Sequence, residues 1–191
     1  MSVFLYCFRE RETLLEAWED TTGGRITPSY ICVGGLLADL SPEFIPKVRR
    51  AIAPLPARFD DYERLLTENP IWLKRTRGIG RLTGDELINW GVTGPMLRAA
   101  GVAWDLRKSQ PYSLYDRFEF DIPTGQDGDV YDRYAVRVAE MRQSVRIIQQ
   151  AIDALPGGAH MSEDRRVWMP PRERVRTDMH AMIHHFKIIE E

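Results

Sequence analysis

The sequence predicts a mainly α-helical fold with a few short strands, formed by residues 1–191 as a single domain. Apolar residues recur at helical spacing over residues 4–20 and 129–155, capping signals precede several other segments, and β-prone runs are short. The 191 residues are 43% hydrophobic and 28% charged. This composition is typical of a globular chain with its own core, and not of a disordered chain.

An apolar stripe defines the first predicted helix, over residues 4–20. Gly23 and Gly24 suit its end, because glycine readily adopts the left-handed conformation that often follows a helix. Residues 29–33 are β-prone and precede a pair of glycines, which predicts a short strand and a turn. The stripe of the first helix consists of Phe4, Phe8, Leu15 and Trp18.

Capping signals define the shorter helices that follow. Ser41 is a good N-cap and precedes a proline at the first helical position, and Pro56 is expected to end that region. Thr83 and Glu86 have the spacing of a capping box, in which each side chain satisfies a backbone amide of the other residue. The expected helices cover residues 42–54, 60–66, 71–77 and 84–90.

A turn-rich segment precedes the strongest predicted helix. Residues 91–128 contain many glycines and prolines, and long irregular segments of this kind are often functional. Within them, residues 118–122 alternate in polarity as a strand does. Over residues 129–155 the apolar positions alternate between spacings of four and three. This pattern predicts a long central helix that is buried on more than one side.

The last predicted helix covers residues 179–189, with Asp178 as its cap, and follows a polar linker over 157–172. His180 and His184 are four residues apart, a spacing that can bind zinc. No glutamate follows His180 and no third ligand is evident in the sequence. We therefore predict packing and surface histidines, and no metal site.

Charge and cysteine usage exclude several classes of function. The net charge of −2 argues against a nucleic-acid partner. No apolar run approaches the roughly 20 residues of a membrane-spanning helix, and no secretory signal is evident. Cys7 and Cys32 form no CxxC pair, which excludes a four-cysteine metal site and favours a reducing compartment. Of the 26 basic residues 22 are arginines, which is typical of ion-paired interfaces or of codon bias.

Three charged residues of the turn-rich segment are candidates for a site. Arg98, Asp105 and Arg107 lie near Trp104 and Tyr112 in the sequence. Charges beside large aromatic residues can line a binding cleft or a subunit contact. A solvated loop explains them as well, and from the residues alone it is the favoured interpretation.

Seven motifs occur in an order that resembles a known family. They are ENPI (68–71), RGIG (77–80), TGPMLR (93–98), GVAWDLRK (101–108), QPY (110–112), GDVYDRY (128–134) and EMRQS (140–144). On these motifs the chain resembles the D subunit of NADH-quinone oxidoreductase, which is the quinone-site subunit of respiratory complex I. The resemblance extends from about Ser2 to Glu190.

The resemblance implies a fold and a set of cofactors. The family is similar to the large subunit of nickel–iron hydrogenases, so the chain is expected to form part of such a fold, with the helix over 129–155 at its centre. The two cysteines cannot supply the CxxC pairs of the nickel site. By resemblance the chain binds no cofactor itself. Quinone is the substrate, a partner holds a 4Fe-4S cluster nearby, and NADH and FMN bind elsewhere in the complex.

The implied function is that of a core peripheral-arm subunit of a proton-pumping NADH:quinone oxidoreductase, which forms part of the quinone cavity. The implied partners are the iron–sulfur quinone-site subunit, other peripheral-arm subunits and the membrane-arm quinone-channel subunit. The implied location is the cytoplasmic face of the bacterial inner membrane. One alternative is a truncated, non-catalytic scaffold segment. Another is the equivalent subunit of a ferredoxin- or deazaflavin-fed quinone oxidoreductase.

Members of the family are about twice as long as this chain. Their headgroup-binding histidine and tyrosine lie in an N-terminal hairpin that the chain does not contain, and their quinone-site aspartate would fall just before Met1. We therefore expect no catalytic residue here and an inactive isolated chain. Arg9 and Arg11 would stabilise that aspartate or relay protons, or else form a surface ion-pair ladder. Arg98, Asp105 and Arg107 would belong to an interface or charge network.

Two positions depart from the family's pattern. Many members have a histidine at the position of Thr27, near the terminal cluster, and an arginine at that of Cys32. A histidine there couples the cluster to protonation, and an arginine raises its potential. With Thr27 and Cys32 the cluster is expected to have a lower potential, which suits a low-potential quinone such as menaquinone.

Overall fold

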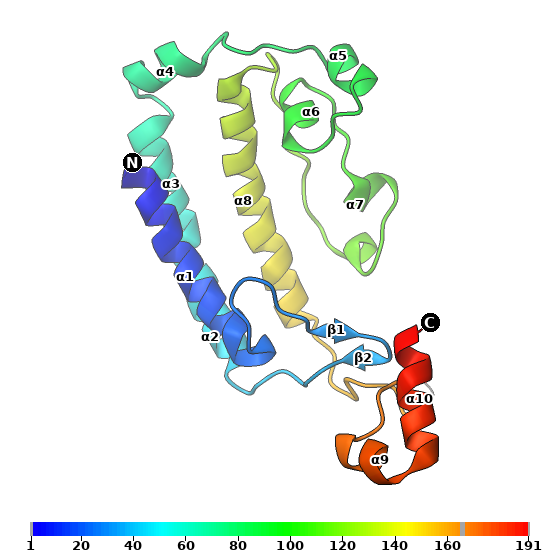
Figure 1. Ribbon diagram of the computed structural model, residues 1–191. Coiled ribbons are helices and arrows are strands. Elements are labelled where there is room, and N and C mark those ends of the chain that lie inside the picture. Colours follow the sequence, from blue (N-terminus) through cyan, green and yellow to red (C-terminus); the bar gives the residue numbers. More distant parts are fainter. Residues whose placement is uncertain (1, 165–166, 191) are drawn as a thin grey trace. The chain divides into compact units, whose positions relative to one another are not determined.

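The computed structural model describes residues 2–164 and 167–190 and is mainly helical, with a small two-stranded sheet (Figure 1). This confirms the predicted mainly α class with short strands. The described residues form two compact units. The first contains residues up to Glu10 together with Arg49–Leu155, and the second contains Arg11–Val48 together with the residues from Pro156 onward. The single domain expected from the sequence stays a prediction.

The first unit is built from short helices around one long helix. Two helices, α1 (Ser2–Thr22) and α2 (Phe44–Ile52), have residues in both units. The elements that lie wholly in the first unit are α3 (Leu55–Leu66), α4 (Pro70–Thr76), α5 (Gly84–Asn89), α6 (Pro95–Ala99), α7 (Leu106–Ser109), the 3₁₀ helix η1 (Tyr115–Arg117) and α8 (Val130–Asp153).

Helix α8 is the centre of the first unit and confirms the long helix predicted over residues 129–155. Asp129 caps it, because its side chain accepts a hydrogen bond from the amide of Asp132 at 2.8 Å. The helix packs against α3, α4 and α6 (Figure 1). Val136 and Val138 are both buried, although two residues at this spacing on a helix point to nearly opposite sides. The helix is therefore covered on more than one face, as predicted.

Two of the shorter helices do not begin where the sequence predicts. Helix α2 begins at Phe44, two residues after the start expected from Ser41 and Pro42, and the Ser41 hydroxyl has no hydrogen-bond partner among the described residues. Thr83 and Glu86 form the reciprocal capping box at the start of α5. Helix α3 begins at Leu55, well before the expected helix over 60–66. The expectation is wrong because Pro56 lies in the first turn of α3, where its missing N–H costs no helical hydrogen bond, and does not end the preceding region.

The strand expected over residues 118–122 is absent from the described first unit. The backbone amides on either side of Phe120 donate to the side-chain oxygens of Gln150 and Gln143 on α8, at 2.8 and 3.1 Å. The alternation in polarity is real, because Phe120 is buried and its two neighbours are exposed. Its hydrogen-bond partners, however, are helix side chains and not a second strand.

Two glycines let the turn-rich segment approach its neighbours closely. A Cβ on Gly125 would lie 2.4 Å from the carbonyl oxygen of Ala99. Gly128 has a φ of +64°, and a Cβ there would lie 2.1 Å from the carbonyl oxygen of Leu82. The amides of these glycines donate to the carbonyls of Arg98 and Ala99, at 2.8 and 3.1 Å respectively. The end of the segment is thereby held against α6.

The second unit contains the small sheet. Strand β1 (Ile31–Cys32) pairs antiparallel with β2 (Gly35–Leu36), where the sequence predicts a short strand followed by a turn. Gly35 also forms an isolated bridge with Met161. The segment expected to be an extended linker is therefore tied to the sheet.

The C-terminal helices of the second unit follow that segment. Helix α9 (Arg172–Thr177) has no counterpart among the expected elements. Helix α10 (Met179–Glu190) confirms the last predicted helix. Asp178 caps it, as expected, by accepting the amide hydrogen of His180 at 2.9 Å.

The apolar stripe of the first helix is largely exposed. Phe4, Phe8 and Trp18 are 61%, 50% and 40% exposed, whereas Ala17 and Thr21 are the buried residues of α1. The helix is confirmed, and the described residues pack on the face of α1 that carries the smaller side chains and not on the apolar stripe. None of the described helices combines the length and the apolarity needed to cross a membrane.

Candidate functional site

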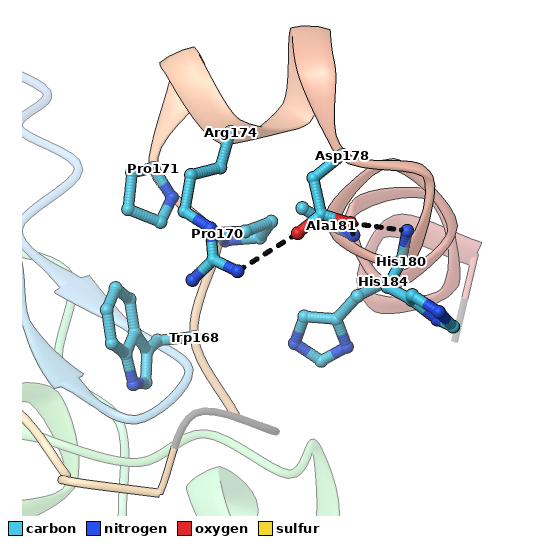
Figure 2. Close-up of a pocket in the computed structure, with 8 residues that line it drawn as sticks. All are labelled: Trp168, Pro170, Pro171, Arg174, Asp178, His180, Ala181 and His184. Atoms are coloured by element: carbon cyan, nitrogen blue, oxygen red, sulfur yellow. Dashed lines mark hydrogen bonds and ion pairs between the residues drawn. The ribbon is translucent and has the colours of Figure 1, made fainter.

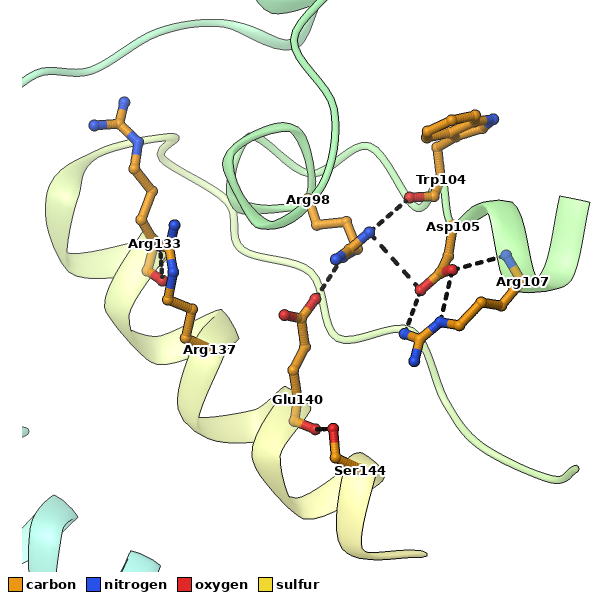
Figure 3. Close-up of polar contacts among 8 residues, drawn as sticks. All are labelled: Arg98, Trp104, Asp105, Arg107, Arg133, Arg137, Glu140 and Ser144. Carbon is orange, nitrogen blue, oxygen red and sulfur yellow. Dashed lines mark hydrogen bonds and ion pairs between the residues drawn. The ribbon is translucent and has the colours of Figure 1, made fainter. Parts of the chain in front are cut away.

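Four charged side chains of the first unit form a cluster, which we call the Arg98 cluster: Arg98, Asp105, Arg107 and Glu140 (Figure 3). Arg98 lies in α6 and donates to the carboxylate of Glu140 on α8 at 2.6 Å. It also donates to the carbonyl oxygen of Trp104 at 3.1 Å. Arg98 and Asp105 are only 7% and 6% exposed. A solvated loop is therefore the wrong interpretation for these two residues.

Asp105 links the two arginines of the cluster. Its carboxylate lies 3.8 Å from Arg98 and accepts two hydrogen bonds from the Arg107 side chain, at 3.0 and 2.6 Å. It also caps α7 by accepting the amide hydrogen of Arg107. Hydrogen bonding to Arg107 lowers the pKa of Asp105, against the opposing effect of burial. The carboxylate is therefore charged at neutral pH, and the cluster holds two positive and two negative charges.

Aromatic rings lie under the cations next to the cluster. The Arg107 guanidinium is 4.8 Å from the ring centroid of Phe120, and the Lys108 ammonium is 4.4 Å from the same centroid. Because its charges pair with one another, the cluster joins the turn-rich segment, which contains α6, to α8. This geometry suits a positioning network better than an acid–base pair. The interface role expected for these residues stays a prediction.

Arg9 and Arg11 lie on α1. Arg9 donates to the carboxylate of Glu10 at 2.5 Å, and its guanidinium carbon is 5.4 Å from the ring centroid of Tyr6. It lines a cavity between α1 and α3. Arg11 is exposed and belongs to the second unit. The contacts of Arg9 suit a surface ion-pair ladder, and the role expected toward the quinone-site aspartate stays a prediction.

Thr27 and Cys32 belong to the second unit. Thr27 is exposed in the loop between α1 and β1. Cys32 is a half-buried free cysteine on β1, and its sulfur lies 3.5 Å from the carbonyl oxygen of Gly35. A thiol is a weak donor, so this contact holds the side chain only loosely. The roles expected near a partner's cluster stay predictions.

A pocket of about 440 Å³ lies in the second unit (Figure 2). Arg174 and Asp178 form an ion pair at 2.9 Å on one side of it, and His180 and His184 of α10 line it as well. Its other walls are Trp168, Pro170, Pro171 and Ala181. Sequence reasoning missed this pocket, because it depends on how the unpredicted helix α9 turns back toward α10. Among the described residues, no group of three or more His, Cys, Asp or Glu is placed to hold a metal ion.

Comparison with known proteins gives one consistent result. The chain matches the family described as respiratory-chain NADH dehydrogenase, 49 Kd subunit, over residues 1–191. Over its whole length it is 50% identical to the D subunit of NADH-quinone oxidoreductase from Wolbachia pipientis subsp. Culex pipiens, of which it covers 49%. It is also 50% identical to the second D subunit of Chloroflexus aurantiacus and 46% identical to the D subunit of Geotalea uraniireducens. In both comparisons all of this chain is matched, with 47% and 49% of the relative covered.

The chain thus spans about half the length of the curated relatives it matches. All four residues of the Arg98 cluster lie in the motifs that carry the resemblance, in TGPMLR, GVAWDLRK and EMRQS. The family match leaves no part of the chain uncovered. The chain therefore belongs to the family of the 49 kDa subunit of respiratory-chain NADH dehydrogenase.

Proposed function

We propose that the chain is a core peripheral-arm segment of a proton-pumping NADH:quinone oxidoreductase and forms part of its quinone-binding cavity. The observation that carries the proposal is the family match over residues 1–191, together with relatives named as D subunits of NADH-quinone oxidoreductase. The chain would pack on an iron–sulfur subunit that holds the terminal 4Fe-4S cluster, and on other subunits of both arms. The fold would be part of a hydrogenase-large-subunit-like fold.

The proposed contribution of this chain is structural support for quinone reduction. The Arg98 cluster would fix the turn-rich segment against α8, so that a rigid wall faces the neighbouring subunits. The Asp105 carboxylate, whose pKa is lowered, has no proton to give at neutral pH. Arg9 and Arg11 would lie near the family's quinone-site aspartate, and their positive charge would favour the ionised form of its carboxylate.

We further propose that Thr27 and Cys32 lower the potential of the partner's cluster relative to members with a histidine and an arginine there. Neither side chain carries a positive charge at neutral pH, so neither stabilises the added electron. A redox titration of the assembled cluster checks this. The variant Thr27→His should add a pH dependence, and Cys32→Arg should raise the potential. A wild-type cluster with a high, strongly pH-dependent potential would refute the proposal.

Native mass spectrometry of the chain co-expressed with the iron–sulfur subunit tests the proposal for partners. The proposal expects a stable one-to-one heterodimer. A chain that stays alone, with the circular dichroism of a folded helical protein, contradicts it. A heterodimer that never supports quinone reduction in the complete complex would instead favour the scaffold alternative. The electron donor is decided by the neighbouring subunits, because an NADH-and-flavin module among them would point to complex I and not to a ferredoxin- or deazaflavin-fed complex.

A further inference from the structure

A cavity of about 380 Å³ lies in the first unit, between the N-terminal half of α1 and α3. It is separate from the Arg98 cluster and shares none of its residues. Three of its lining side chains are arginines. Helix α1 contributes Tyr6 and Arg9, and α3 contributes Arg58, Asp61, Tyr62 and Arg64.

The cavity carries a positive charge that its own carboxylates do not cancel. Three guanidinium groups face one lining carboxylate, Asp61, and the neighbouring Glu10. Arg58 lies between these two acids, 3.6 Å from Glu10 and 3.7 Å from Asp61. Both separations exceed a normal hydrogen bond. The guanidinium of Arg58 therefore keeps donors available for a ligand.

The other two arginines are held in place at the edges of the cavity. Arg9 is fixed by Glu10 and lies over the Tyr6 ring, and Arg64 donates to Asp61 at 2.7 Å. Each of these contacts uses only part of the five donors of an arginine. The remaining N–H groups of the three side chains suit an oxyanion with several acceptor oxygens, because such groups are bound by forked, charge-assisted hydrogen bonds.

Tyr62 adds a polar group to the lining of the cavity. It is 3% exposed, and its buried hydroxyl makes no hydrogen bond to a nitrogen or oxygen of the described residues. It interacts with the Cys7 thiol, which is a weak partner. Desolvation raises the pKa of Tyr62 to about 12, so the hydroxyl keeps its proton. A buried hydroxyl with a proton to donate suits an anion better than a cation.

The rim of the cavity is apolar. Leu65 and Tyr6 line the cavity and are 46% and 41% exposed. A cluster of cations beside exposed apolar side chains matches an amphipathic ligand whose charged group is anionic. A soluble phosphate would use the arginines but not the rim.

We propose that this cavity binds a phosphate group, and that the group belongs to an anionic phospholipid whose chains lie against the apolar rim. The arginines would bind the phosphate oxygens, and Tyr6 and Leu65 would contact the acyl chains. The inference goes beyond the proposed quinone function. The two proposals share Arg9, but Arg58 and Arg64 have no part in the quinone proposal, so variants at these two positions test the cavity alone.

Flotation of the 191-residue chain with vesicles tests the proposal. The chain should bind phosphatidylglycerol–phosphatidylcholine vesicles and not pure phosphatidylcholine vesicles. The double variant Arg58→Gln/Arg64→Gln should lose binding at least about fivefold, because it removes two of the three cations that face the phosphate. The matched control is Lys74→Gln/Arg75→Gln, two exposed cations on α4. It should stay within about twofold of the wild type, because the lost cations lie outside the cavity.

Circular dichroism of both double variants confirms that each is folded. Equal losses in the two variants would mean a general charge effect and would overturn the proposal. A second arm uses inorganic phosphate and follows the side-chain N–H signals of Arg58 by NMR. Saturable shifts without vesicle binding would overturn the lipid assignment in favour of a soluble phosphate. Absence of both responses would overturn the site itself.

Discussion

Arg98 holds a full positive charge at a position that is 7% exposed, surrounded by Glu140, Asp105 and the carbonyl oxygen of Trp104. Such a charge is tolerated only because its partners are present, and of these Glu140 depends on the arginine most directly, through a hydrogen bond of 2.6 Å. The sequence shows these residue types, but it does not show that they lie in contact. Glu140 lies 42 residues after Arg98 in the chain, and only the packing of α6 on α8 brings the two together.

The variant Arg98→Met should destabilise the chain by about 3 kcal/mol, because it leaves the Glu140 carboxylate without its buried partner. The free energy of unfolding in urea measures this. Arg137→Met on α8 is the matched control, since Arg137 is exposed and its described side-chain bond is to a carbonyl of its own helix. The double variant Arg98→Met/Glu140→Leu should recover most of the loss. Additive losses in the double variant would show that the two residues do not form a coupled pair.

The pH dependence of stability should report Asp105. Its pKa is lowered in the folded chain, so its contribution is present above the ordinary aspartate pKa of about 3.9 and is lost as the pH falls through the folded value. Urea unfolding at about pH 3 and about pH 6, on either side of that ordinary value, checks this. Asp105→Asn should reduce the difference between the two pH values, and Asp116→Asn, at an exposed position, should not. An unchanged difference in Asp105→Asn would place the effect elsewhere.

The start of helix α8 is stabilised by a capping residue. Asp129 accepts the amide hydrogens of Asp132 at 2.8 Å and of Gly78 at 2.7 Å, so one buried carboxylate both caps α8 and ties it to the turn after α4. The cap is readable from the sequence, because an aspartate before an apolar-periodic run is a local signal. The hydrogen bond to Gly78 joins residues far apart in the chain, so no local sequence pattern predicts it.

Asp129→Ala should lower the free energy of unfolding by about 2 kcal/mol. The loss has two sources, the missing helix cap and the Gly78 amide that is left without its acceptor. Asp129→Asn keeps one side-chain oxygen that can accept, so its loss should fall between the wild type and the alanine variant. The urea midpoint and slope of the three proteins test this order. Equal losses for Ala and Asn would mean that charge, and not the number of acceptors, stabilises the helix start.

The turn before α8 depends on a glycine. Gly128→Ala should destabilise by more than about 2 kcal/mol, because the residue has a positive φ and its Cβ would meet the Leu82 carbonyl oxygen at 2.1 Å. The matched control is Gly157→Ala, where a Cβ would meet nothing within 4 Å. That substitution should be neutral or slightly stabilising. A tolerated Gly128→Ala would show that the segment can shift away from Leu82.

At the scale of the whole molecule, helical periodicity and capping residues predicted most of the longer helices. The alternation in polarity over residues 118–122, by contrast, predicted a strand that the described first unit does not contain. The stretch around Phe120 reads as a strand, because alternating burial looks the same whether its amides bond to a strand or to Gln143 and Gln150. The α1 stripe reads as core, yet Phe4 and Phe8 are exposed in this half-length chain. The pockets of both units depend on tertiary packing and were not predictable. Family membership, by contrast, was readable from seven short motifs.

The most direct test of the proposed function is quinone reduction by a chimeric complex. The chain would replace the matching half of the D subunit in the complex of Geotalea uraniireducens, to which it is 46% identical. NADH-driven reduction of a short-chain quinone would then be measured in membranes. We predict an assembled complex with a rate within about tenfold of the parent, a barrier difference of about 1.4 kcal/mol. An assembled complex with a reducible terminal cluster but no quinone reduction would contradict the proposal.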